Sequence, residues 1–213
     1  MLYSKLSETA QERARAWYRE NCLDHEWWDS EYDHWKEKLA ELGFSDPDIR
    51  HSGFCCQGDG ASFTAKVTRE FKLPAAGLQR IEEATAVAKV NRRFAGLSAH
   101  VDLFYDLSFR IERDIHDRYV HPYTIRAEYT LNVGDDVPED ISKMLETWAD
   151  ELRNGLTQEA RDLSDQIYRS LETEWDYLNS DEAIAESIEA NDWSFNEDGD
   201  HIPRARRKQL AAA

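Results

Sequence analysis

The chain of 213 residues carries 43 acidic and 26 basic side chains, which gives a formal net charge of −17 at pH 7. Aromatic residues make up 11% of the sequence and include seven Trp, so the composition excludes global disorder and supplies a sizeable core. An acidic surface of this kind repels nucleic acid and attracts basic partners, so direct binding to nucleic acid is not expected.

Membrane proteins and metalloproteins are disfavoured by the pattern of apolar residues and cysteines. No apolar run approaches the roughly 20 residues of a membrane span, and residues 1–18 lack the apolar core of a signal peptide. A cytoplasmic protein without membrane contact is therefore predicted. Cys22, Cys55 and Cys56 suit neither a disulfide framework nor a zinc site, because no CxxC or paired Cys/His spacing accompanies them. No metal or cofactor is expected.

The N-terminal segment is predicted to form two helices. A capping box of Thr9 and Glu12 starts the first helix. One face of this helix is apolar and carries Ala10, Ala14, Trp17 and Tyr18. Asp24 caps the second helix, in which an apolar seam runs over residues 28–42 before Gly43 ends the helix. This seam is also the surface through which a homodimer is predicted to pack, if one forms.

The next segment begins with a short turn at Asp46–Pro47 and then changes to a period of two, which is typical of strands. Residues 62–71 alternate between apolar and polar side chains. Residues 50–56 are predicted to be the partner strand of a hairpin, with residues 57–60 as the connection. After Pro74 a helix is predicted that ends at Gly96, and its inward side chains are Leu78, Ile81, Ala84, Ala88 and Phe94.

Two long antiparallel strands follow, and their pattern is the clearest in the chain. Most odd positions from Leu97 to Ile115 are apolar, and the even positions are nearly all polar. After a turn at His116–Arg118, the alternation resumes and continues through residues 119–133. Such strands place one face on a core and the other in water. Pro122 lacks a backbone donor, so it is expected at an edge or a bulge.

The C-terminal half is predicted to be helical. Pro138 opens a helix, Gly155 interrupts it, and Thr157 caps its continuation. Ser180 caps a short final helix, and Phe195 anchors the segment that follows.

These elements follow the order α-α-β-β-α-β-β-α-α. The predicted fold class is α+β, with a small antiparallel sheet of about four strands packed with N- and C-terminal helices. A single domain is predicted over residues 1–200, because no repeat or Gly/Ser linker divides it. Residues 201–213 form a basic tail that is predicted to be disordered. All 43 acidic residues precede this tail, and its terminal LAAA is typical of a vector remnant.

The candidate binding site is the Gly-rich segment of the first hairpin. Glycine permits positive φ and close backbone approach, and exposed N–H groups in such a turn can bind an anion. The alternative is a hairpin turn in which Asp-Gly satisfies the turn geometry. The adjacent cysteines have no neighbouring base in the sequence, so a nucleophilic role is not expected. The candidate ligand- or partner-binding residues are Ser52, Gly53, Phe54, Gln57, Gly58, Asp59, Gly60 and Ser62.

Histidines suggest two further sites, and each has a simpler interpretation. The segment His25–Asp29 resembles an HExxH metal motif with Asp in the second ligand position, but acids at a helix start also complement the helix dipole. The other group is equally well explained as a solvated sheet face. It lies on or beside the two long strands and comprises His100, Asp102, Asp106, Arg110, His116 and His121. No catalytic triad, Walker loop or GxGxxG occurs, so no catalytic residue is assigned.

Four segments carry a family resemblance: WWDSEYD (27–33), RHSGFCCQGDGASF (50–63), GLSAHV (96–101) and YRSLETEWDYLNSDEAIAESIEANDWSFNEDG (168–199). They resemble a family of small acidic proteins encoded by bacteriophages and prophages, which share SGFxxQGDGAxF and DYLxSDEA…ANxxxFxxDG motifs. Some members are labelled as antitoxins of toxin–antitoxin systems. The resemblance is weak over residues 70–135. It implies a phage origin and a cytoplasmic setting, and it supplies no active site.

The charge and the resemblance together favour a phage-type, non-enzymatic interaction protein. Its acidic surface is expected to bind and inhibit a basic host protein: a toxin, a nuclease or a DNA-binding defence complex such as CRISPR, with DNA mimicry as one mode. The alternative is a small-ligand-binding protein or enzyme. Such a protein would hold a nucleotide or a phosphorylated metabolite against the Gly-rich hairpin at residues 52–63.

Overall fold

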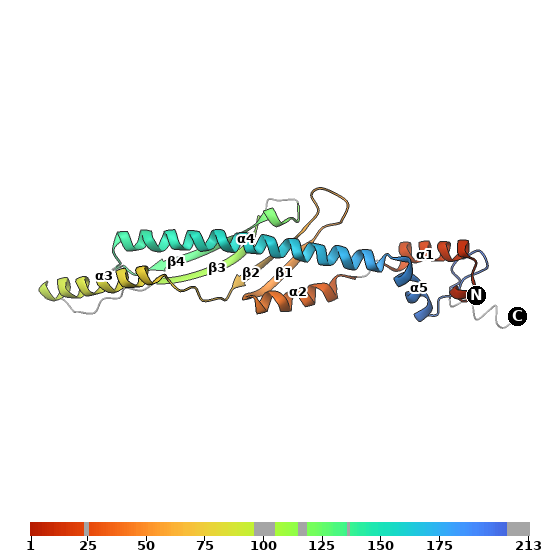
Figure 1. Ribbon diagram of the computed structural model, residues 1–213, viewed down its shortest axis with the longest axis horizontal. Coiled ribbons are helices and arrows are strands. Elements are labelled where there is room, and N and C mark those ends of the chain that lie inside the picture. Colours follow the sequence, from red (N-terminus) through yellow and green to blue (C-terminus); the bar gives the residue numbers. More distant parts are fainter. Residues whose placement is uncertain (24–25, 96–104, 115–118, 136, 204–213) are drawn as a thin grey trace. The chain divides into compact units, whose positions relative to one another are not determined.

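The computed structural model describes residues 1–23, 26–95, 105–114, 119–135 and 137–203 (Figure 1). This part of the chain contains five α-helices and a four-stranded antiparallel sheet, so the predicted α+β class is confirmed. The chain forms two compact units, one from Met1–Glu31 with Arg169–Ala213 and the other from Tyr32–Tyr168. We call these unit 1 and unit 2. The single domain over residues 1–200 remains a prediction.

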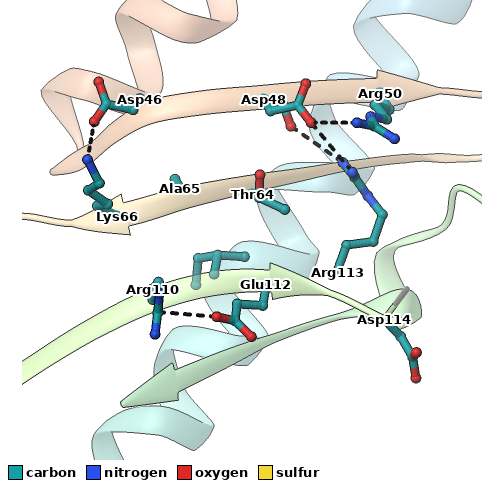
Figure 2. Close-up of a pocket in the computed structure, with 11 residues that line it drawn as sticks. Asp46, Asp48, Arg50, Thr64, Ala65, Lys66, Arg110, Glu112, Arg113 and Asp114 are labelled. Carbon is teal, nitrogen blue, oxygen red and sulfur yellow. Dashed lines mark hydrogen bonds and ion pairs between the residues drawn. The ribbon is translucent and has the colours of Figure 1, made fainter. Parts of the chain in front are cut away.

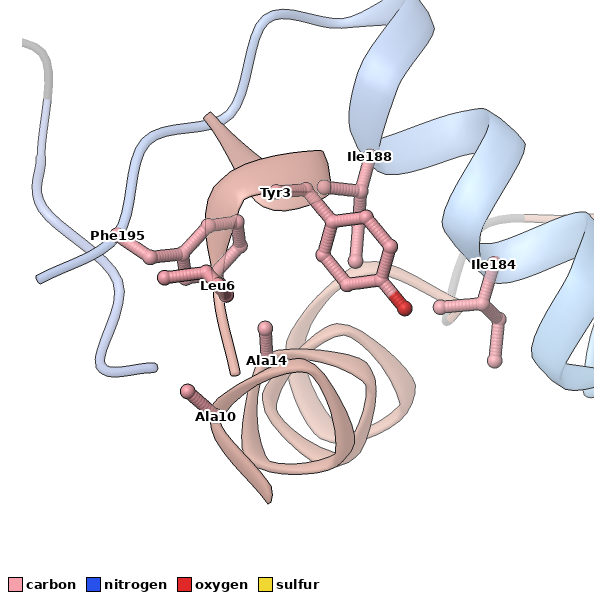
Figure 3. Packing of buried hydrophobic residues seen from close by; sticks show 7 residues of the cluster. All are labelled: Tyr3, Leu6, Ala10, Ala14, Ile184, Ile188 and Phe195. Atoms are coloured by element: carbon pink, nitrogen blue, oxygen red, sulfur yellow. The ribbon is translucent and has the colours of Figure 1, made fainter. Parts of the chain in front are cut away.

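Unit 1 is built around helices α1 (Glu8–Cys22) and α5 (Asp181–Ala190), with a short 3-10 helix η1 (Tyr3–Lys5) before α1. Figure 3 shows its core, in which the predicted anchor Phe195 is fully buried. The buried cluster is formed by Tyr3, Leu6, Ala10, Ala14, Ile184, Ile188 and Phe195. The apolar face predicted for the first helix is therefore the face that packs into the core of unit 1.

Two helix caps in unit 1 test the sequence interpretation. Ser180 caps α5 as predicted, because its hydroxyl accepts a hydrogen bond from the backbone N–H of Ala183. The cap predicted at Thr9 is wrong. Ser7 caps α1, with its hydroxyl accepting from the N–H of Ala10 at 3.3 Å, and Thr9 lies inside the first turn. Two hydroxyl residues so close together offer competing caps, and the backbone entering from η1 selects Ser7.

Unit 1 is closed by the segment after α5. The backbone N–H of Ile202 donates to the carbonyl of Ser194 at 2.7 Å, and His201 stacks on the ring of Trp17 at 4.0 Å. Gly199 adopts φ +87° where its Cα faces the carbonyl of Ala10. Defined contacts therefore extend through residue 202. The rest of the tail predicted to be disordered, from residue 204 onward, lies outside the described residues.

Unit 2 contains the sheet, with strand order β1-β2-β3-β4. Its strands are β1 (Phe44–His51), β2 (Ala61–Val67), β3 (Tyr105–Arg113) and β4 (Ile125–Val133). Helix α2 (Asp29–Glu41) precedes β1, and Gly43 follows it with φ +83°, in the terminating role predicted for it.

The first hairpin exists, but its predicted boundaries are wrong. Strand β1 starts six residues earlier than predicted, and the loop between β1 and β2 covers residues 52–60. Asp46 and Pro47 do not form a turn. They lie within β1, at a register shift between Ser45 and Asp48. A bulge tolerates a residue without a backbone donor, so the strand continues past Pro47.

The alternation predicted for the two long strands is confirmed within β3 and β4, but it is wrong for residues 119–124, which precede β4 and in which Tyr119 and Tyr123 are 62% and 74% exposed. Phe109 and Ile111 of β3 and Ile125 and Ala127 of β4 are buried, and their neighbours along each strand are more exposed. Pro122 begins a 3-10 helix, η2 (Pro122–Thr124), that leads into β4, so it does not sit within a strand. Residues 97–104, with the predicted start of the first strand, and the turn at 116–118 lie outside the described residues.

Helix α4 (Glu139–Leu178) runs without a break through Gly155, where an interruption was predicted. Thr157 does not cap a second helix. Its hydroxyl donates to the carbonyl of Arg153 at 2.8 Å and accepts from the backbone N–H of Ala127 at 3.0 Å. This contact joins α4 to β4 and places the helix against the sheet. Packing along the helix outweighs the cost of one glycine, which is about 1 kcal/mol.

Helix α3 (Ala75–Phe94) presents only part of its predicted inward face to a core. Ile81 and Ala84 pack on a buried cluster that includes Leu145 of α4. Leu78 is 47% exposed, so its predicted inward position is wrong. It lies about 60° around the helix from Ile81, towards the solvent side. Gly96, the predicted end of this helix, lies outside the described residues.

The apolar seam of α2 is used within unit 2. Trp35 and Leu39 are 4% and 0% exposed, respectively. These two side chains are therefore already covered by the chain itself. A homodimer through this helix would have to use other residues of the seam.

Candidate functional site

The candidate site predicted from sequence is a closed loop between β1 and β2. Ser52 and Gly60 join its ends: the Ser52 N–H donates to the Gly60 carbonyl at 3.0 Å, and the Gly60 N–H donates to the Ser52 hydroxyl, also at 3.0 Å. The structure thus brings together six of the predicted residues. They are Ser52, Gly53, Phe54, Gly58, Asp59 and Gly60.

Asp59 organises the interior of this loop. One of its carboxylate oxygens accepts from the backbone N–H groups of Cys55 and Cys56, each at 2.8 Å. These bonds hold the pKa of Asp59 below its usual value. They also occupy two N–H groups of the turn in which an anion was predicted to bind. An anionic ligand here would have to compete with a carboxylate that is covalently part of the loop.

Glycines of the loop allow other segments to approach closely. A Cβ at Gly58 would lie 2.8 Å from the ring of Tyr119, and one at Gly60 would lie 2.9 Å from the carbonyl oxygen of Val120. On another side, the Tyr168 hydroxyl donates to the Gly53 carbonyl at 3.3 Å. The glycines therefore serve packing between the loop and its neighbours.

The other two predicted residues differ in position: Gln57 belongs to the same loop, and Ser62 lies outside it. Gln57 is exposed at the loop surface. Ser62 belongs to β2 and is fully buried, and its hydroxyl accepts from Nε of Arg113 at 2.9 Å. Cys55 and Cys56 lie in the loop, where both are exposed.

A tyrosine–histidine pair lies at the base of the loop and was not predicted. The hydroxyl of Tyr32 and Nδ1 of His51 are 2.6 Å apart, and His51 also stacks on Phe54 at 5.9 Å. Burial lowers the pKa of His51, which favours the neutral ring. The pair ties the start of α2 to the end of β1, and no sequence pattern linked residues so placed.

The histidine sites considered from sequence receive no support from the described residues. His25, His100, Asp102 and His116 lie outside those residues. His121 accepts a hydrogen bond from the N–H of Tyr123 and stacks on its ring at 5.1 Å. Across the described ranges, no three His, Cys, Asp or Glu side chains are grouped so that they could hold a metal ion.

The outer face of the sheet contains a hollow of about 670 Å³, on the side that faces away from α4 (Figure 2). We call it the sheet hollow. Its basic side chains come from three strands and are Arg50, Lys66, Arg110 and Arg113. Its acidic side chains are Asp46, Asp48, Glu112 and Asp114. The alternation of the strand places Arg110 on a solvated face, but no sequence pattern predicts the hollow.

The hollow lies where β2 and β3 separate. The two strands pair at Ala65–Val67 and Phe109–Ile111, and within the described residues the start of β2 pairs with β1 alone. Arg113 spans the gap: its guanidinium contacts the Ser62 hydroxyl at 2.9 Å and the backbone carbonyls of Ser62 and Asp48, each at 3.4 Å. Only 13% of its side chain is exposed.

Like charges are crowded in the hollow. The Asp48 carboxylate lies 3.2 Å from Arg50 and 3.6 Å from Arg113, so two guanidinium groups share one anion. Burial is the main cause that lowers the pKa of Arg113, and the positive charge of the nearby Arg50 lowers it as well. Lys66 and Arg110 are direct cross-strand partners, and opposed like charges of this kind destabilise a sheet.

A family profile described as a domain of unknown function (DUF8835) matches residues 27–181. The chain belongs to this family. The DUF8835 match covers all of the sheet, the β1–β2 loop and the sheet hollow. Comparison with curated proteins and with solved structures found no match. Among the described helices of this DUF8835 protein, none has both the length and the apolarity that crossing a membrane requires.

Proposed function

We propose that this protein is a phage-type, non-enzymatic interaction protein whose acidic surface binds and inhibits a basic host protein. The partner class comprises toxins, nucleases and DNA-binding defence complexes such as CRISPR, with DNA mimicry as one mode of inhibition. The net charge of −17 motivates this proposal. One surface of unit 2, on helix α4, also supports the proposal.

The supporting observation is a row of carboxylates along α4. Glu151, Asp162 and Asp165 are exposed and lie within about 60° of one another around the helix, given 3.6 residues per turn. Glu151 and Asp162 are separated by three turns, or about 16 Å along the axis. We call these three residues the acidic row. The outer face of the sheet differs, because its hollow has four basic and four acidic side chains.

An acidic row on a straight helix suits a basic partner for two reasons. Exposed carboxylates accelerate the encounter with a positively charged surface, and salt weakens this attraction. A long helix also holds the charges at fixed spacing, so a partner that normally tracks a regular line of phosphates could engage them without rearrangement. Mutual exclusion of DNA and this protein would follow if both use the same basic surface.

The experiment uses the full chain as bait at low salt in a bacterial lysate, followed by binding kinetics with the purified basic protein that is captured. The test variant is Glu151→Gln/Asp162→Asn/Asp165→Asn. We expect its association rate to fall by about tenfold or more at low salt and to differ little from the wild type at high salt.

The control removes the same charge from other exposed positions, Glu82→Gln/Glu83→Gln/Asp106→Asn. This control should bind nearly as fast as the wild type. If low-salt capture recovers no basic protein, or if both triple variants bind equally slowly, the proposed role of the acidic row is wrong.

A further inference from the structure

We infer that the sheet hollow is a binding site for a small phosphorylated molecule that also carries hydroxyl groups. This inference is independent of the proposed function, because it concerns the opposite side of the sheet from α4 (Figure 2). It also differs from the anion site predicted at the β1–β2 loop, where Asp59 already takes the N–H groups of Cys55 and Cys56.

The arrangement of charges around the hollow is costly for the folded protein. Four of the 26 basic residues of the chain surround this one hollow, together with four carboxylates. Two juxtapositions there are unfavourable: Lys66 faces Arg110 across the ladder, and Arg50 and Arg113 share the Asp48 carboxylate. Sequences depart from local stability rules chiefly at functional sites. A bound dianion would relieve both repulsions.

The hydrogen-bond donors around the hollow suit a phosphate group. Arginine presents a planar fork of N–H groups that matches the oxygens of a phosphate, and lysine adds a point charge. Arg50, Lys66 and Arg110 are 62%, 72% and 63% exposed, so their heads can reorient toward a ligand. Arg113 is held by Ser62 and Asp48 and provides a fixed charge at the floor of the hollow.

The acidic side chains of the hollow suit the hydroxyl groups of the ligand. Asp46 and Glu112 lie beside the basic groups, at 2.9 Å from Lys66 and 3.1 Å from Arg110. When phosphate draws those cations away, the carboxylates become acceptors for hydroxyl groups. The volume of the hollow, about 670 Å³, lies within the range typical of sites for small molecules. The net charge of the chain opposes entry of an anion only within the Debye length of about 10 Å at 0.1 M salt.

The test titrates the full chain with ribose 5-phosphate, orthophosphate, ribose and succinate at equal ionic strength, with backbone amide resonances as the readout. We expect saturable shifts around Thr64–Lys66 and Arg110–Arg113 with both phosphates. Ribose 5-phosphate should bind more tightly than orthophosphate because of its hydroxyl groups, and ribose should not bind. If neither phosphate gives saturable shifts, or if succinate binds as well as ribose 5-phosphate, the inference is overturned.

The chain provides a matched control for the variants. Arg110 and Arg126 are both 63% exposed on the outer face, and each pairs with a glutamate two residues later, but Arg126 does not line the hollow. Arg110→Gln and Lys66→Gln should each weaken ribose 5-phosphate binding by about tenfold or more, and Arg126→Gln should leave it unchanged. An equal loss in all three variants would indicate non-specific attraction and would refute the site.

Discussion

Replacing Gly155 with Ala is expected to stabilise unit 2. Gly155 lies inside the 40-residue helix α4, and a Cβ added there would meet no atom within 4 Å. The substitution therefore introduces no clash and restricts the unfolded chain, whose conformational entropy is largest at glycine. The expected gain in the free energy of unfolding is about 0.5–1 kcal/mol. For a protein of this size the corresponding rise in Tm is about 2–4 °C per kcal/mol.

The assay is urea denaturation followed by far-UV circular dichroism, with thermal unfolding as a second measurement. Gly199→Ala is the comparison, because Gly199 has φ +87° and its added Cβ would lie 2.2 Å from the Ala10 carbonyl oxygen. That variant should lose at least about 1–3 kcal/mol from backbone strain. A Gly155→Ala protein that unfolds at lower urea than the wild type would refute the reasoning, since it would mean that α4 needs flexibility at this position.

Three further outcomes follow from the structure. Ser180→Ala should cost about 1 kcal/mol through loss of the α5 cap, measured as a lower urea midpoint in tryptophan fluorescence. Burial lowers the pKa of both His51 and His201, so their contribution to stability is complete above the unfolded pKa of about 6.5 and is lost as the pH falls below it. The urea midpoint of unfolding should therefore be lower at pH 5.5 than at pH 7.5. His201→Phe should reduce the difference between these two midpoints. Lys66→Gln should leave the free energy of unfolding unchanged or raise it by at most about 0.5 kcal/mol, because repulsion from Arg110 is removed with an exposed ion pair. A clear loss of stability in that variant would show that Lys66 contributes favourably to the sheet.

The candidate loop shows how far sequence reasoning extends to a site. The density of glycine and small polar residues correctly indicated a loop between two strands, but the positive φ that glycine permits occurs at Gly43 and Gly199 and not in this loop. The partners of that backbone could not be predicted. Tyr119 and Tyr168 reach Gly58 and Gly53 from distant segments, and Asp59 turns inward to its own loop. Each of these contacts depends on where other elements place their side chains.

The sheet hollow lay beyond sequence reasoning for a related reason. Alternation assigns Lys66 and Arg110 to the exposed sides of their strands, but only the register makes them neighbours. The separation of β2 from β3, which allows Arg113 to span the gap, is likewise a property of the assembled sheet.

Local periodicity and backbone stereochemistry were enough to determine the fold class, the alternation of β3 and β4, the cap at Ser180 and the helix end at Gly43. These features depend on residues within one or two turns of each other, so a linear pattern contains them. Tertiary structure decided the continuity of α4 through Gly155, the bulge that accommodates Pro47 and the grouping of four cations in one hollow. At Gly155 these contacts outweighed a local preference of about 1 kcal/mol, and in all three cases they join residues that are distant in the sequence, so no single stretch of sequence reveals them.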